Sequence, residues 1–349
     1  MSESTNNLQT SPRLKWVDCA KGVAMLSIIL GHCLEYINSD MGCSTFLLPI
    51  VYSFSVPLFF MISGFFHKSE GIGFGKYLLK KVRTILLPYV TFAVVCLAVS
   101  AVRIYIFKTP LDYTVSWEIG ALIRQNHYNF MWFLAVLFVT EIVAYFLLRK
   151  RNYILICAVI AGAIIAAFLL RRFDLLCLPW AVDVVPFALI FYATGFALRS
   201  LEEKVLRKYL FPVYLIIGLA LVFVNLKVSP GLRYVNMYKS DYGSLPLYFL
   251  SGIFMSLGIL CICRQTGKSK LLGYIGKSSL IFYGFHPTIL SFLMHFVRKI
   301  PLTSYPLYIA VTFCTLVVIT ALNCIIPPII NNTPLCVLFG KPYKRKKSK

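Results

Sequence analysis

The stretch DCAKGVAMLSIILGHC, residues 18–33, has the composition of a membrane-spanning helix but carries three ionisable side chains. Asp18, Lys21 and His32 interrupt an otherwise apolar run. A charged side chain near the centre of a spanning helix costs about 2.5–3.5 kcal/mol on insertion scales. The stretch therefore predicts a helix inside a bundle, where these side chains contact partners or a ligand.

The rest of the chain is also apolar. Of its 349 residues, 59% are hydrophobic and 14% are charged, against about 45–50% and 25% in soluble domains. The predicted fold class is therefore an all-α integral membrane protein with about ten transmembrane helices. The expected spans are residues 16–37, 46–66, 85–107, 131–149, 153–170, 180–198, 209–226, 245–263, 278–297 and 305–328.

The chain has a net charge of +22, and its basic residues are distributed as in a membrane protein with alternating internal and external loops. With the N-terminus in the cytoplasm, 24 of the 35 Lys and Arg residues fall in cytoplasmic segments and 9 in external ones. This bias predicts that both termini are cytoplasmic. Because the basic residues occupy short loops and the C-terminal end, the charge does not indicate nucleic acid as a partner.

The predicted organisation is a single membrane domain with two polar ends. We expect a disordered N-terminal tail at residues 1–12, the membrane domain at 13–330 and a basic cytoplasmic tail at 331–349. The first apolar run has no clear cleavage site and is expected to remain as a span. The chain has no Cys-x-x-Cys, His-x-x-His or Gly-rich phosphate motif, so neither a metal site nor ATP is expected.

Four polar side chains of the first span share one helical face. Eleven residues separate Lys21 from His32, which is three turns plus about 20° and about 16 Å along the axis. Asp18 lies one turn before Lys21, and Glu35 one turn after His32. Asp18 could simply pair with Lys21, and His32 could hydrogen-bond to a neighbouring helix. The shared face favours a functional site.

The segment LKWVDCAKGVAMLSIILGHC, residues 14–33, resembles the opening of the acyltransferase 3 family, and the branch close to fucose 4-O-acetylases is the most similar. The family motif is a basic residue, ten further residues and a histidine, which Lys21 and His32 match. Many members have arginine in place of Lys21. The resemblance extends over about residues 13–290, through YSFSVPLFFMISGFF (52–66), KVRTILLPY (81–89), WFLAVLF (132–138), LPWAVDVVPFALIFYATGF (178–196) and YIGKSSLIFYGFH (274–286).

This resemblance implies a membrane O-acyltransferase that modifies cell-surface glycans. The implied acyl donor is acetyl-CoA on the cytoplasmic side, and the implied acceptor is a hydroxyl of a glycan or a lipid-linked sugar. The expected location is the bacterial inner membrane, with membrane lipid as the surrounding partner. About ten helices are also implied, in agreement with the count from hydropathy.

Candidate donor-binding residues lie near the inner surface. Lys21 and Arg83 are cations suited to the phosphates of CoA, and Asp18 is expected to pair with Lys21. The basic group around Arg83 could instead reflect topology alone.

Candidate catalytic residues lie deeper in the spans. A neutral imidazole at His32 suits a general base that takes a proton from the sugar hydroxyl. The carboxylate that orients it could be Glu35, Glu141 or Asp183. Glu141 could instead bond to a neighbouring helix.

Three further residues are candidates for binding the acceptor. Trp132 and Trp180 could stack on a sugar ring, although aromatic residues are common at membrane interfaces without any such role. His286 precedes Pro287, which bends a helix and frees a carbonyl, so His286 could bind substrate or satisfy that local polarity.

Two other functions use the same residues differently. A transporter or flippase for glycans or lipids would line its path with the interior polar groups. A non-catalytic membrane-assembly protein would tolerate changes at Lys21 and His32.

Overall fold

The computed structural model describes residues 13–37, 45–107, 131–149, 152–172, 178–267 and 269–343. These residues form helices, and the strand-like pairing among them is one isolated bridge between Asn236 and Asp241. The predicted all-α class is confirmed. The tail expected at 1–12 and the last residues, 344–349, lie outside the described residues.

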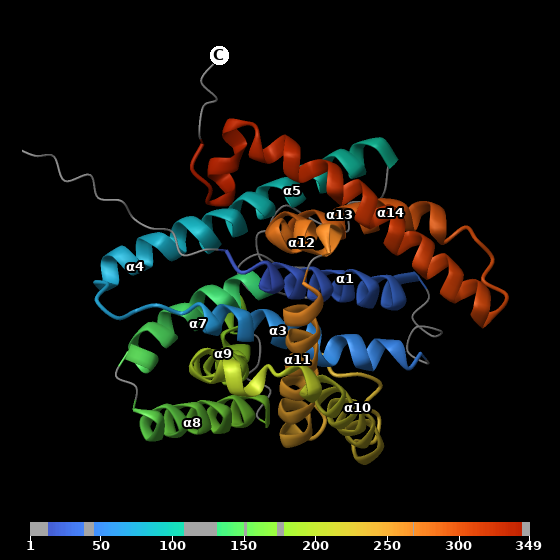
Figure 1. Ribbon diagram of the computed structural model, residues 1–349. Helices are drawn as coiled ribbons and strands as arrows, with labels where there is room; N and C mark the ends of the chain where they lie inside the picture. Colours follow the sequence, from blue (N-terminus) through green and yellow to red (C-terminus); the bar gives the residue numbers. More distant parts are fainter. Residues whose placement is uncertain are drawn as a thin grey trace, which may run out of the picture.

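Among the described residues from 15 to 266, eight long α-helices and several shorter elements succeed one another, as Figure 1 shows. They are α1 (Lys15–Ile37), α3 (Leu47–Phe65), α4 (Phe74–Lys81), the π-helix η1 (Val82–Leu86), α5 (Leu87–Phe107), α7 (Trp132–Arg149), α8 (Tyr153–Arg172), the 3-10 helix η2 (Pro179–Val184), α9 (Val185–Val205), the 3-10 helix η3 (Lys208–Leu210), α10 (Phe211–Val228) and α11 (Leu245–Thr266). The described chain ends with α12 (Lys270–Lys277), α13 (Ser279–Val297), α14 (Tyr305–Asn331) and the 3-10 helix η4 (Pro334–Phe339).

Nine helical segments in the described residues are long and apolar enough to cross a membrane. They correspond to the expected spans within a few residues at most boundaries, except that the third begins at Phe74 rather than at residue 85. The helix α8 occupies the expected fifth span but is not among the nine. The count of ten and the orientation of the termini therefore stay predictions.

The third span starts early because α4, η1 and α5 form one continuous helical run. The basic residues expected in a loop before the span, Lys80 and Lys81, instead lie on the last turn of α4. The π-helical turn that follows contacts α7. Lys81 therefore lies on a helix beside α7, where its side chain forms an ion pair with the buried Glu141.

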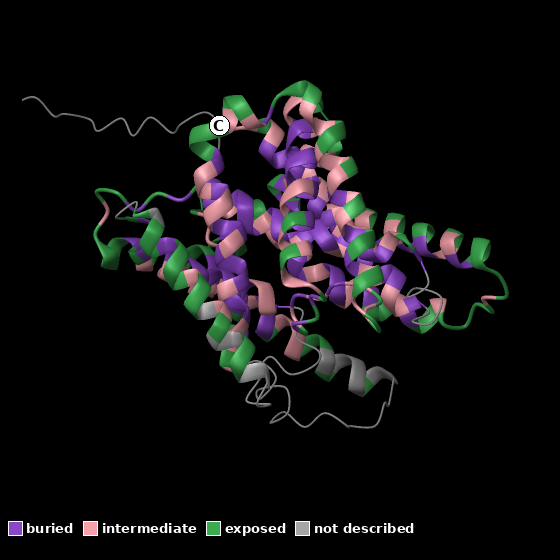
Figure 2. Ribbon diagram, turned by 90° about the horizontal axis from the view of Figure 1, so that it is seen from below, coloured by how far each residue is buried: buried purple, intermediate pink, exposed green. Residues whose placement is uncertain are grey.

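The helix α1 lies inside the bundle, as its polar residues predict. It contacts α3, α11, α12, α13 and α14, and Figure 1 shows it between α12 and α3. In its most apolar stretch 67% of the residues are buried, against 17% for α10 and 22% for α14. Buried residues gather in the centre of the bundle, and exposed ones on the outer helices (Figure 2). The outer helices therefore present their apolar side chains away from the protein, as a lipid-facing layer does.

Glycine residues allow helices of the bundle to approach at their backbones. A Cβ atom on Gly195 of α9 would overlap the carbonyl oxygen of Met61 in α3, and one on Gly64 would overlap that of Tyr192. A Cβ on Gly276 of α12 would overlap the carbonyl oxygen of Asp18 in α1. Small residues at such crossings are the usual means of close helix packing in membranes.

Part of the segment expected as a basic tail packs on the bundle. The helix η4 contacts α5, where the Thr91 hydroxyl donates to the Leu338 carbonyl oxygen at 3.2 Å. Gly340 follows with φ of 73°, a left-handed conformation that glycine adopts without a steric penalty. This turn lies against the backbone of Arg83 and Thr84, so the C-terminal segment contacts the start of the third span.

The crossing of α3 and α9 yields a prediction about stability. Gly195→Ala forces a methyl group against the Met61 carbonyl, and we expect it to lower the free energy of unfolding by about 1–3 kcal/mol. The measurement is the thermal unfolding midpoint of the detergent-solubilised chain. Gly162→Ala is the matched control, because Gly162 lies on α8 with open space around its Cβ position. Equal midpoints for the two variants would contradict the close crossing.

Candidate active site

His32 lies on α1 beside two aromatic rings from other helices. Its ring stacks on that of His286 in α13, with centroids 5.4 Å apart and planes inclined by 26°. Its Nδ1 atom lies 3.5 Å from the Tyr52 hydroxyl of α3, at the outer limit of a hydrogen bond. Two histidines more than 250 residues apart in sequence are thus brought together at one place in the bundle.

The carboxylate of Glu35 is the acidic group linked to His32. Tyr52 donates to its Oε2 at 2.8 Å, and Tyr234 donates to its Oε1 at 2.8 Å. Because the Tyr52 hydroxyl donates its hydrogen bond to Glu35, its oxygen can accept a hydrogen bond from an N–H at His32 Nδ1. That arrangement leaves His32 Nε2 with its lone pair, which is the tautomer that a general base needs. Of the three carboxylates considered from the sequence, Glu35 is the one placed to orient His32.

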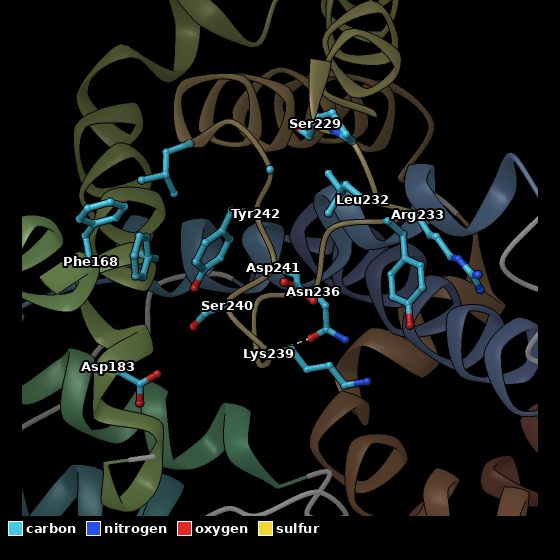
Figure 3. Close-up of a pocket in the computed structure, with 16 residues that line it drawn as sticks. Phe168, Asp183, Ser229, Leu232, Arg233, Asn236, Lys239, Ser240, Asp241 and Tyr242 are labelled. Atoms are coloured by element: carbon cyan, nitrogen blue, oxygen red, sulfur yellow. Dashed lines mark hydrogen bonds between the residues drawn. The ribbon is translucent and has the colours of Figure 1, made fainter. Parts of the chain in front are cut away.

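Tyr234 connects this group to a pocket of about 740 Å³. The pocket is formed mainly by the segment 229–245 between α10 and α11, together with Phe168, Asp183 and Phe187 (Figure 3). Arg233, Lys239 and Asp241 give it charged groups of both signs. A concave site with several polar groups and aromatic rings is suited to a polyhydroxylated ligand.

The backbone of the pocket segment is held by specific hydrogen bonds. Asn225 of α10 donates from Nδ2 to the Tyr242 carbonyl at 2.9 Å and accepts at Oδ1 from the Ser244 amide at 2.8 Å. Asn236 and Asp241 exchange backbone hydrogen bonds of 2.7 and 2.9 Å. These hydrogen bonds fix the conformation of the segment between α10 and α11, so that a connection predicted only as a loop forms a wall of the pocket.

Asp183 lines this pocket. It follows Trp180 and Ala181, whose φ angles of 60° and 51° are left-handed. Such angles are unfavourable for residues other than glycine and occur often near functional sites. The strained turn directs Asp183 into the pocket wall, which suits contact with the acceptor rather than orientation of His32.

The two tryptophans have different surroundings. The Trp132 ring packs on Tyr238 of the pocket segment, with centroids 5.7 Å apart. The Trp180 ring contacts Tyr89 and Phe138, at 6.3 and 6.4 Å. Trp132 therefore borders the segment that forms the pocket, whereas Trp180 packs among aromatic residues of α5 and α7.

Glu141 belongs to a separate buried cluster. It accepts hydrogen bonds of 2.6 Å from Tyr77 and Tyr192 and forms a 2.6 Å ion pair with Lys81. His67 joins the cluster through Tyr192, at 2.9 Å. The Glu141 carboxylate is thus partnered by side chains of α4 and α9. This arrangement matches the alternative noted from the sequence, bonding to neighbouring helices.

The inner end of α1 differs from the expectation. Asp18 accepts two hydrogen bonds from the Arg13 guanidinium, at 2.5 and 2.9 Å, while its interaction with Lys21 is one of charge alone. The bidentate geometry of arginine suits a carboxylate better than a lysine does. Lys21 Nζ lies over the Phe66 ring, 5.8 Å from its centre, and Arg83 is exposed on η1.

The C-terminal segment adds cations to this end of the molecule. Lys341 Nζ donates to Asn331 at 2.9 Å. Burial, together with nearby Arg13 and Lys277, lowers the pKa of Lys341. With Lys21, these residues form what we term the inner cation cluster: Arg13, Lys21, Lys277 and Lys341. It lies at the end of α1 opposite to the pocket.

Sequence reasoning missed the two tyrosines that connect His32 to the pocket. Tyr52 opens a quoted segment, and a tyrosine within a spanning helix needs a hydrogen-bond partner, so it could have been considered. Tyr234 could not, because it lies 199 residues from Glu35 in sequence. Among the described residues, no group of three or more His, Cys, Asp or Glu side chains could hold a metal ion.

Comparison with known proteins supports the resemblance at the level of the family. The acyltransferase 3 family model, described as an acyltransferase domain, matches residues 14–324. This range includes both histidines, the pocket segment and the Glu141 cluster. Comparisons with curated proteins and with solved structures give no match.

The Glu141 cluster yields a prediction that separates structural from catalytic roles. Lys81→Met leaves a buried carboxylate without its cation, and we expect a loss of about 3–5 kcal/mol in the free energy of unfolding. The double variant Lys81→Met/Glu141→Gln removes the stranded charge and should regain most of that loss. Thermal unfolding in detergent measures both effects, with Lys80→Met at the exposed neighbouring lysine as the control. A Glu141→Gln chain of unchanged stability but without activity would contradict a structural role for Glu141.

Proposed function

Because the chain belongs to the acyltransferase 3 family, we propose that it is a membrane O-acyltransferase that transfers an acetyl group from acetyl-CoA to a glycan hydroxyl. The acceptor is a cell-surface or lipid-linked sugar, as in the fucose 4-O-acetylase-like branch that the sequence resembles. The protein would act in the bacterial cytoplasmic membrane. The observation that carries the proposal is the hydrogen-bonded path from the pocket through Tyr234, Glu35 and Tyr52 to His32.

The proposed reaction begins at His32. Its Nε2 takes the proton of the acceptor hydroxyl as the oxygen attacks the thioester carbonyl carbon. The new C–O ester bond forms, the C–S bond breaks, and the CoA thiolate takes the proton back from the imidazolium. Tyr52 and the Glu35 carboxylate support the imidazolium while it is charged, in the way that a buried carboxylate supports a catalytic histidine.

The acyl donor is proposed to bind from the inner side. The inner cation cluster offers point charges and one guanidinium to the phosphates of CoA. The axial distance from Lys21 to His32 is about 16 Å, so the extended pantetheine arm would carry the thioester along α1 toward His32. Asp18 then acts by holding Arg13 in place, and the exposed Arg83 is a weaker candidate than it was from the sequence alone.

The acceptor is proposed to bind in the pocket of segment 229–245. On the predicted topology this segment is external, which suits a glycan that is modified on or near the outer surface. Trp132 borders the pocket segment and Asp183 lines the pocket, which suits roles in contacting the sugar. Trp180 is enclosed by other aromatic rings and is better suited to holding the turn that precedes Asp183.

Substitution of His32 tests the proposal. His32→Gln keeps a polar side chain but cannot accept and release the proton, so we expect acetyl transfer to fall by about 10²–10⁴-fold. The measurement is transfer of radiolabel from acetyl-CoA to a panel of methyl glycosides by the purified full chain. His295→Gln, at an exposed histidine of α13, is the matched control and should keep its activity.

Two results would count against the proposal. Near-full turnover by the His32→Gln chain would remove His32 from the chemistry. Movement of a glycan or lipid across vesicles by a wild-type chain that transfers no acetyl group would favour the transporter instead.

A further inference from the structure

His286 is a histidine whose hydrogen-bonding state is determined by its own helix. Its side chain is fully buried, and its Nδ1 atom lies 3.0 Å from the carbonyl oxygen of Phe282, one turn earlier. A carbonyl oxygen only accepts, so Nδ1 must be the donor. In the neutral imidazole the other ring nitrogen, Nε2, is then an acceptor.

That acceptor has no partner within the described part of the chain. Nε2 of His286 is enclosed and makes no hydrogen bond there. Buried polar atoms in folded proteins are nearly always hydrogen-bonded, because leaving one unpaired is unfavourable. The missing partner is then a hydrogen-bond donor from outside the described part of the chain, which a bound molecule can supply. The thioester group itself presents only acceptors, and the first N–H of the pantetheine arm lies two carbons beyond its sulfur, whereas a sugar presents hydroxyl donors on neighbouring carbons.

The position beside His32 limits which hydroxyl this can be. The two rings stack with centroids 5.4 Å apart, so one bound sugar can contact both. A hydroxyl has a single proton, and in the proposed reaction His32 takes the proton of the hydroxyl that is acylated. The donor that reaches His286 must then come from another group of the same acceptor.

We infer that Nε2 of His286 accepts a hydrogen bond from a second hydroxyl of the acceptor, on the carbon next to the acylated one. The inference rests on the proposed function and adds the substrate class: sugars that present two neighbouring hydroxyls, a vicinal diol, to the paired imidazoles. His286 thereby holds the acceptor with its reacting hydroxyl at His32. It contacts substrate and does not itself transfer the proton.

The first arm of the test removes the second hydroxyl from the substrate. The purified wild-type chain is given acetyl-CoA and a panel of methyl glycosides, and the best acceptor is compared with its monodeoxy forms. Removing the hydroxyl next to the acylated position should lower kcat/KM by about 10- to 100-fold, because Nε2 is left unpaired again. Removing a more distant hydroxyl should have a smaller effect.

The second arm removes the hydrogen-bond-accepting Nε2 atom of His286 from the protein. Asparagine can place a donor near the position of Nδ1 but has no group at Nε2, so His286→Asn keeps the bond to Phe282 and loses the substrate contact. Glutamine places an amide oxygen near the position of Nε2. We expect His286→Asn to lower kcat/KM for the parent glycoside by about 10- to 100-fold, and His286→Gln to retain more activity than His286→Asn.

The two arms combine into a double-mutant cycle. In the His286→Asn chain the deoxy glycoside should react almost as fast as the parent, because the contact is already absent. A deoxy penalty that persists in His286→Asn would overturn the inference and leave His286 a packing residue. Equal reactivity of parent and deoxy glycosides in the wild-type chain would also overturn it, as expected if a water molecule occupies Nε2.

Failure of the proposed function gives a different result. A wild-type chain that acetylates no glycoside would overturn acyl transfer to sugars, and the diol inference with it. A wild-type chain that acetylates glycosides without any dependence on the neighbouring hydroxyl would overturn only the inference. If His286→Asn is unstable in detergent, the wild-type chain decides. A loss of kcat/KM on removal of the neighbouring hydroxyl supports the inference, and no loss overturns it.

Discussion

The carboxylate of Glu35 is the group on which the outer half of the bundle depends. It lies on a membrane-spanning helix, where an unpartnered charge is costly, and it accepts hydrogen bonds from Tyr52 and Tyr234. These bonds tie α1 to α3 and to the segment between α10 and α11. The need of the Glu35 carboxylate for hydrogen-bond donors thus holds Tyr234 of the pocket wall close to α1. It also orients the Tyr52 hydroxyl beside His32.

The same requirement divides α1 into two ends with different chemistry. At the inner end Asp18 is satisfied by Arg13, and Lys21 lies over an aromatic ring beside other cations. At the outer end His32 is paired with a second imidazole and connected to a pocket. A helix with cations at one end and paired imidazoles at the other is consistent with the proposed transfer from a phosphorylated acyl donor to a hydroxyl acceptor.

The Glu141 cluster shows how a second buried charge is stabilised in the bundle. Lys81 reaches Glu141 because α4, η1 and α5 form one helical run. Two tyrosines donate hydrogen bonds to the Glu141 carboxylate, and His67 lies within hydrogen-bonding distance of one of them, Tyr192. Buried charges that are paired in this way fix the relative positions of helices rather than supply reactive groups.

Local patterns in the sequence predicted much of this structure. Hydropathy located most spans within a few residues, and the 100° periodicity placed His32 and Glu35 on one face, because both properties depend on neighbouring residues alone. Arg13 was not predicted as the hydrogen-bonding partner of Asp18, because it lies before the helix, where periodicity gives no direction. Tyr234 reaches Glu35, and His286 reaches His32, only through tertiary packing, and no pattern within a single span contains that information.

The most direct measurement of the central claim is acetyl transfer across a sealed membrane. The full chain is reconstituted into vesicles in one orientation, with radiolabelled acetyl-CoA on the side of the inner cation cluster and a methyl glycoside on the side of the pocket. We expect acetylated glycoside to accumulate on the pocket side, and none to form when donor and acceptor exchange sides. Product formed only when donor and acceptor share one side would contradict a reaction centred on α1 between the two surfaces.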